Sequence, residues 1–75
     1  MEYLKVEGTF PYVIRIGMSD NVFTNVTMGE LQTWAEKTLG KLDETWSFDL
    51  DTTKWVMDFR FLDKKGAMAF KLKWM

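Results

Sequence analysis

The sequence predicts an α+β fold, in which one antiparallel sheet carries one helix on one of its faces, in the order β-β-α-β-β-β. Apolar and polar side chains alternate in segments on both sides of a central stretch, as in strands with one buried face. The central stretch repeats its apolar residues every three or four positions, which is typical of an amphipathic helix. The 75 residues suit one domain, covering residues 1–75.

Two strands are expected before the helix. The first covers residues 3–7 and ends before Pro11, because proline has no backbone N–H to donate to a neighbouring strand. The second covers residues 12–18, where the side chains of one face are all apolar. Residues 19–26 are expected to form a polar loop that leads into the helix.

The expected helix begins at Thr27 and ends at Gly40. Thr27 and Glu30 have the spacing of a capping box, in which each side chain accepts a hydrogen bond from the other's backbone N–H. Glycine commonly ends a helix because it can take the left-handed conformation. The apolar stripe of this helix consists of Met28, Leu31, Ala35 and Leu39.

Three further strands are expected at residues 46–50, 55–62 and 68–74, joined by tight turns at 51–54 and 63–66. The turns set the expected register, which pairs Leu50 with Trp55, Phe48 with Met57, Phe59 with Phe70 and Asp58 with Lys71. Both hairpins then place apolar side chains opposite apolar side chains. Each such pair contributes roughly 0.2–1 kcal/mol.

The last segment also fits a helix over residues 64–75, starting from a cap at Asp63. That helix would place three apolar side chains on one stripe: Ala67, Phe70 and Trp74. A glycine in its first turn, Gly66, and the strict alternation over residues 68–74 favour the strand.

The chain has no cysteine and no histidine. It therefore has no disulfide or thiol chemistry, and it lacks the commonest general base and metal ligand. We expect no catalytic residue, no cofactor and no metal site, and hence a protein that is not an enzyme. No apolar run approaches the roughly 20 residues of a membrane span, and residues 1–5 lack the pattern of a signal peptide. A cytoplasmic protein with no membrane partner is the resulting expectation.

Three aspartates, Asp49, Asp51 and Asp58, are expected on the solvent-facing side of the sheet. Carboxylates on neighbouring strands are compatible with acid–base catalysis or with a Mg²⁺ site. The interpretation we favour is a solvated face, because basic side chains are available as cross-strand partners and no apolar surroundings are expected there. The partners expected for these carboxylates are Lys71, Lys73 and Arg60.

Basic residues concentrate near the C-terminus, although the net charge is −1. A nucleic-acid contact is possible there, with five candidate residues: Arg60, Lys64, Lys65, Lys71 and Lys73. Single-stranded nucleic acids usually need exposed aromatic side chains for stacking, and the aromatics of this segment are expected on the buried face. Lysines on a terminal strand also prevent edge-to-edge aggregation. Nucleic-acid binding is therefore the alternative function and not the favoured one.

The chain has four tryptophans: Trp34, Trp46, Trp55 and Trp74. Their spacing places them in the core more readily than around a ligand. In so small a domain, one bulky ring is expected to remain on the surface at an interface.

The C-terminal run contains Phe59, Phe61 and Asp63, followed by Ala67 and a final Phe70-Lys71-Leu72-Lys73-Trp74. In this pattern the chain resembles small uncharacterised proteins of marine T4-like phages, over about its second half. The resemblance implies a phage accessory protein in the host cytoplasm, without a known activity. In several of those proteins the corresponding segment is helical, which implies a ferredoxin-like β-α-β-β-α fold with residues 64–75 helical.

The expected function is that of a small non-enzymatic protein-interaction module. Four tryptophans, six phenylalanines and six methionines are a large apolar supply for 75 residues. One helix of about fourteen residues is also too narrow to cover the apolar face of four or five strands. Two copies could bury the remainder through a twofold interface, so a homodimer is expected.

Overall fold

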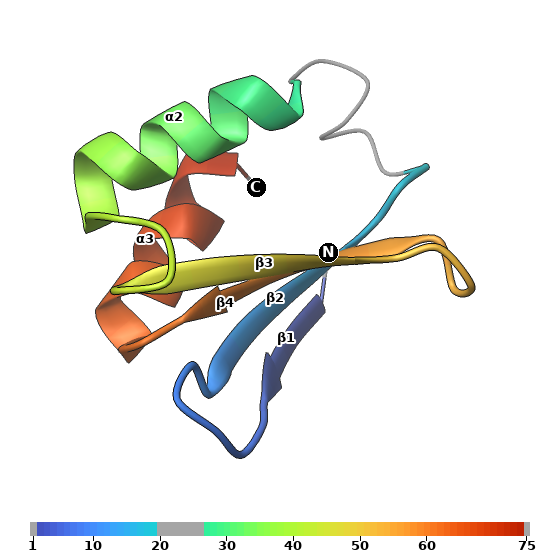
Figure 1. Ribbon diagram of the computed structural model, residues 1–75, viewed down its shortest axis with the longest axis horizontal. Helices are drawn as coiled ribbons and strands as arrows, with labels where there is room; N and C mark the ends of the chain where they lie inside the picture. The colour runs from blue at the N-terminus through green and yellow to red at the C-terminus, as the bar shows by residue number, and fades with distance from the viewer. Residues whose placement is uncertain (1, 20–26, 75) are drawn as a thin grey trace.

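The computed structural model describes residues 2–19 and 27–74. It contains a sheet of four antiparallel strands in the order β1-β2-β4-β3, with two helices on one side of it (Figure 1). The elements are β1 (Glu2–Lys5), β2 (Tyr12–Gly17), α2 (Met28–Leu39), β3 (Trp46–Asp51), β4 (Val56–Phe61) and α3 (Lys64–Trp74). The α+β class and the antiparallel sheet are confirmed. The expected loop before the helix lies largely outside the described residues.

The two expected N-terminal strands are present and pair with each other as β1 and β2. Gly8 has a φ of 127°, which allows the chain to turn between them. The backbone N–H of Val6 donates to the carbonyl oxygen of Pro11 at 2.8 Å and closes the connection. Strand β2 then pairs with β4 rather than with β3, so β4 lies in the interior of the sheet.

Both predicted ends of helix α2 are confirmed. The Thr27 side chain accepts a hydrogen bond from the backbone N–H of Glu30 at 3.2 Å. At the other end Gly40 has a φ of 116°, and a Cβ there would lie 2.9 Å from Oγ1 of Thr45. The Gly40 carbonyl also accepts a 2.9 Å hydrogen bond from Nε1 of the buried Trp46. Glycine is therefore required here both by its backbone conformation and by close packing.

The predicted hairpin between β3 and β4 exists, but its register is wrong by two residues. Phe48 lies opposite Phe59, whereas we expected it opposite Met57, and Leu50 takes the place opposite Met57. A shift of two residues leaves every side chain on its predicted face, because faces alternate with period two. The assignment of buried and open faces is therefore unaffected.

The turn itself explains this shift. It covers residues 52–55, one position later than the expected 51–54, and includes Trp55, whose φ of 57° lies in the left-handed region. The carboxylate of Asp51 accepts backbone hydrogen bonds from Thr53 at 2.9 Å and from Lys54 at 3.0 Å. The carbonyl of Trp55 accepts one from the backbone N–H of Met18 at 3.0 Å. These bonds hold the turn in its shifted position.

The predicted last strand is wrong, because residues 64–74 form helix α3, which was the rival interpretation. The Asp63 side chain accepts a hydrogen bond from the backbone N–H of Gly66 at 3.0 Å and caps the helix. A Cβ at Gly66 would lie 3.3 Å from Cδ1 of Phe61, so glycine permits the helix to pack closely on β4. The expected strand pairs of Phe59 with Phe70 and of Asp58 with Lys71 therefore do not form, although the first two rings are in contact.

The two helices and one face of the sheet enclose the core. Its ten buried members are Ile14, Ile16, Leu31, Ala35, Trp46, Met57, Phe59, Phe61, Ala67 and Phe70. Helix α3 packs against β2 and β4. The face that we expected one helix to leave partly uncovered is thus shared by two helices. The element order differs from the ferredoxin-like alternative by the additional strand β1, while its terminal helix is confirmed.

Candidate functional site

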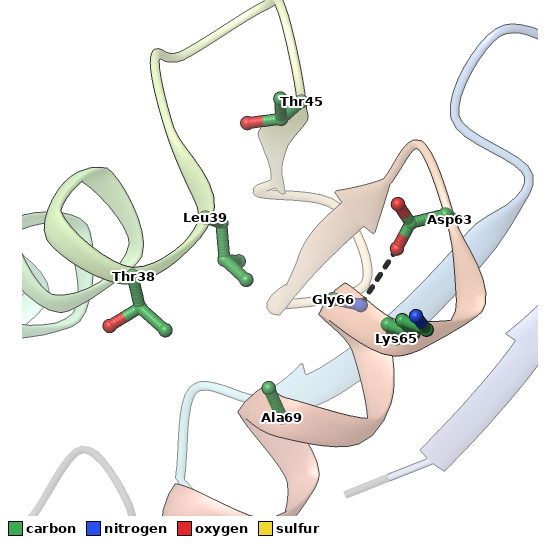
Figure 2. A pocket seen from close by; sticks show the side chains of 7 residues that line it. All are labelled: Thr38, Leu39, Thr45, Asp63, Lys65, Gly66 and Ala69. Carbon is green, nitrogen blue, oxygen red and sulfur yellow. Dashed lines mark hydrogen bonds between the residues drawn. The ribbon is translucent and has the colours of Figure 1, made fainter.

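Two pockets lie between α2 and α3, the smaller where α2 ends and α3 begins, the larger where α2 begins and α3 ends. We call the space between the two helices the groove, and the smaller and larger pockets its narrower and wider ends. Its narrower end has a volume of about 320 Å³ and is shown in Figure 2. Seven residues line it: Thr38, Leu39, Thr45, Asp63, Lys65, Gly66 and Ala69. Its one carboxylate, on Asp63, already accepts the capping hydrogen bond from Gly66. A structural role therefore accounts for the main polar group at this end.

The wider end of the groove has a volume of about 550 Å³ and is lined by Thr27, Gly29, Glu30, Thr33, Trp34, Lys37, Lys73 and Trp74. The indoles of Trp34 and Trp74 meet edge to face, with ring centroids 6.1 Å apart. The ammonium group of Lys73 lies 5.3 Å from the centroid of the Trp74 ring. Nε1 of Trp74 is shielded from solvent and donates to no acceptor among the described residues.

The face of the sheet away from the helices carries a network of two arginines and two aspartates. Arg15 donates from Nε to Oδ1 of Asp58 at 2.8 Å and from its terminal nitrogen to Oδ2 at 3.0 Å. Arg60 lies 3.3 Å from Asp49 and 3.9 Å from Asp58. Hydrogen bonding to Asp58, together with the charge of that carboxylate, raises the pKa of Arg15. The network links three neighbouring strands, β2, β4 and β3.

These contacts correct and extend the prediction for the aspartates. Arg60 is a partner of Asp49 and Asp58 as expected, but Lys71 and Lys73 lie on α3, on the other side of the sheet (Figure 1). The main partner of Asp58, Arg15, was not predicted. The alternation over residues 12–18 placed Arg15 on the open face, but finding its partner required the pairing of β2 with β4. The arrangement is a set of ion pairs across strands.

The five candidate nucleic-acid contacts do not form one surface. Arg60 lies on the open face of the sheet within the network just described. The other four candidates all lie on α3: Lys64, Lys65, Lys71 and Lys73. This helix contains no acidic residue. The structure therefore gathers four of the predicted residues onto one helix and separates the fifth from them.

Among the described residues, the most exposed large apolar side chains lie at the β3–β4 turn and on α3. At the β3–β4 turn, the side chain of Trp55 is 53% exposed and that of Leu50 is 46% exposed. On α3, Leu72 is 81% exposed, and Met68 on the preceding turn is 41% exposed. Of the four tryptophans, Trp46 is fully buried in the core as predicted, whereas Trp55 lies outside it. Exposed Trp55 agrees with the expectation that one bulky ring stays on the surface, but its predicted position in a strand is wrong, because it lies in the turn.

Residues 2–19 and 27–74 contain no group of three or more acidic residues placed to hold a metal ion. No helix in the described part of the chain is long and apolar enough to cross a membrane. Comparison of the chain with protein-family models, with curated proteins and with solved structures finds no match. The resemblance to phage proteins therefore stays a prediction.

Proposed function

We propose that this protein is a non-enzymatic interaction module that self-associates through the tip of its β3–β4 hairpin. The observation that carries the proposal is Trp55, a bulky residue that is exposed although its backbone lies in the left-handed region. That conformation costs an ordinary residue roughly 1–2 kcal/mol. A role for the indole in binding accounts for its presence at this position. The resemblance of the C-terminal run adds a phage accessory role in a host cytoplasm to the proposal.

The turn presents this indole in a fixed position. On one side of Trp55, the Asp51 carboxylate accepts two backbone hydrogen bonds from the turn. At Trp55 itself, the carbonyl accepts a backbone hydrogen bond from Met18. A preformed contact loses little conformational entropy on binding, and tryptophan is enriched among residues that dominate interface energies. Leu50, which precedes the same turn, extends the apolar surface.

Charge favours a second copy of the chain at this surface. In a twofold interface each residue of one copy faces the equivalent patch of the other. The turn carries one aspartate, Asp51, and one lysine, Lys54, so two copies can meet there without net repulsion. The exposed surface of α3 carries four lysines and no acid, so two copies would repel each other there.

Light scattering between about 1 and 300 µM protein tests the proposal. The wild-type mass is expected to rise from 8.9 kDa towards twice that value. Trp55→Asn is expected to stay at 8.9 kDa over the same range, because asparagine tolerates the left-handed conformation but lacks the indole. The association should change little between 50 and 500 mM salt, since its interface is apolar.

The matched control is Leu72→Asn, which removes the most exposed leucine from the other apolar surface. It is expected to associate like the wild type. A wild-type mass of 8.9 kDa at the highest concentration would contradict self-association. Loss of association in Leu72→Asn but not in Trp55→Asn would place the interface on α3 and contradict the proposed surface.

Nucleic-acid binding is the second candidate, and the four lysines of α3 favour it. Each phosphate contact releases counterions, so the affinity for a mixed-sequence single-stranded oligonucleotide should fall steeply with salt. In fluorescence anisotropy, Lys64→Gln combined with Lys65→Gln is expected to reduce the slope of log affinity against log salt by about 1.4. The paired substitution of Lys41 and Lys54, which lie outside α3, is the control. No binding at 20 mM salt would exclude this candidate.

A further inference from the structure

We propose that the wider end of the groove between α2 and α3 is a binding site for a planar aromatic carboxylate. The site is formed by Trp34 and Lys37 of α2 and by Lys73 and Trp74 of α3, with Glu30 at its edge. It shares no residue with the hairpin tip that holds Trp55. The two surfaces can therefore be tested separately.

The size and walls of the groove favour a flat apolar molecule. Its volume of about 550 Å³ lies within the range of roughly 300–1,000 Å³ that is common for small-molecule sites. Trp34 contacts Trp74 at 6.1 Å and Phe70 at 5.9 Å between ring centroids, in both cases edge to face. This contact leaves two half-buried indoles lining one groove, and an aromatic ring is the partner that such a surface accepts most favourably.

The charges around the groove favour an anion. Lys37 and Lys73 contribute two positive charges, one from each helix, and Glu30 contributes one negative charge. Helix α2 begins at the wider end of the groove and α3 ends there. The positive end of one helix dipole therefore offsets the negative end of the other. The charged side chains then determine the sign of the electrostatic potential. Their net charge is +1, which a single carboxylate on the ligand would neutralise.

Trp74 supplies a hydrogen-bond donor that lacks an acceptor. Its Nε1 is shielded from solvent and has no partner among residues 2–19 and 27–74. Buried indole N–H groups are usually paired, as Nε1 of Trp46 is with the carbonyl of Gly40 at 2.9 Å. A carboxylate oxygen can serve as its acceptor once a side chain beside the shielded N–H moves aside. The same ligand would thus provide a ring for the indoles, a charge for the lysines and an acceptor for Trp74.

Two-dimensional NMR of the four indole N–H groups tests the site, with 2-naphthoate as the probe and 2-naphthalenemethanol as its uncharged analogue. The signals of Trp34 and Trp74 are expected to move with saturation as 2-naphthoate is added, while those of Trp46 and Trp55 stay in place. The uncharged analogue should bind several-fold more weakly. Lys37→Gln and Lys73→Gln should each weaken 2-naphthoate about two- to fivefold, the usual range for one exposed charge pair.

Lys71→Gln is the matched control, because this lysine lies on α3 but does not line the groove. It is expected to bind 2-naphthoate like the wild type. Unchanged Trp34 and Trp74 signals at millimolar probe would overturn the proposal, as would saturable shifts confined to Trp55. Equal affinity for the two probes, or equal weakening by all three lysine substitutions, would overturn the recognition of a carboxylate at this position.

Discussion

Replacing Phe59 with alanine is expected to lower the free energy of unfolding by about 3–5 kcal/mol. Phe59 lies on the interior strand β4, is fully buried, and packs against three other aromatic rings. The ring centroids of Phe70, Phe48 and Trp46 lie 4.8, 6.1 and 6.5 Å from it. Alanine would leave a cavity that these neighbours, which belong to strand β3 and helix α3, cannot jointly fill. Since small domains are stable by only about 5–15 kcal/mol, this loss can abolish folding.

Urea unfolding followed by tryptophan fluorescence measures this change, with circular dichroism as a second probe. Leu72→Ala is the control, because its leucine is 81% exposed and its loss should change the free energy by less than about 0.5 kcal/mol. If Phe59→Ala lost less than 1 kcal/mol, the aromatic cluster around β4 would not be the centre of the core. A midpoint shift without a change in slope would confirm that only stability was altered.

The sequence was sufficient to predict the core-facing side of β2, α2, β3 and β4. Alternation with period two and apolar repetition with period 3.6 are local properties, and both are visible in strands β2, β3 and β4 and in α2. The pairing register of β3 with β4 was harder to predict, because it depends on where the turn between them lies. The β3–β4 turn was misplaced since a tryptophan in the left-handed region is rare and no local signal marks it.

The final segment shows why a local pattern can be ambiguous. Over residues 68–74 the apolar side chains alternate, as in a strand. In helix α3, however, Ala67 and Phe70 lie on one side, and both are buried. Whether this segment forms a strand or a helix therefore depends on long-range packing. Gly66 lets the helix approach Phe61 on β4, a contact that only the assembled fold reveals. In consequence Met68 and Leu72, which a strand over residues 68–74 would place on the same face as Phe70, are exposed.

The candidate sites depend even more on the assembled fold. The groove lies between two helices, of which α2 was the favoured prediction and α3 only the rival interpretation. The four lysines of α3 were recognised as a cluster from composition alone, because charge density is a local property. The pairing of Arg15 with Asp58 spans 43 positions along the chain and became visible only when β2 was placed beside β4.

Replacing Asp58 with alanine is expected to lower the free energy of unfolding by about 2–3 kcal/mol. Asp58 is only 7% exposed and accepts two hydrogen bonds from Arg15. Breaking a buried ion pair typically costs about 3–5 kcal/mol, because the remaining charge is left without a partner. The Arg15 side chain is 34% exposed, so water can solvate part of its charge and reduce this loss. Arg60 would also lose one of its two carboxylate neighbours.

The raised pKa of Arg15 sets the expected alkaline behaviour of this pair. A folded-state pKa above the unfolded value means that the cation stabilises the fold at every lower pH. That contribution disappears only as the pH rises through the raised pKa. The difference in stability between the wild type and Asp58→Ala should therefore stay constant between about pH 7 and pH 10.

A double-mutant cycle with Arg15→Met separates the pair from the rest of the network. Methionine keeps much of the apolar stem of the arginine, so the cycle isolates the interaction between the two charged groups. We expect a coupling energy of about 1–2 kcal/mol, because two hydrogen bonds join charged groups at a partly exposed position. Additive losses would instead show that Arg15 and Asp58 stabilise the sheet independently. Asp58 would then depend mainly on Arg60, which lies 3.9 Å away.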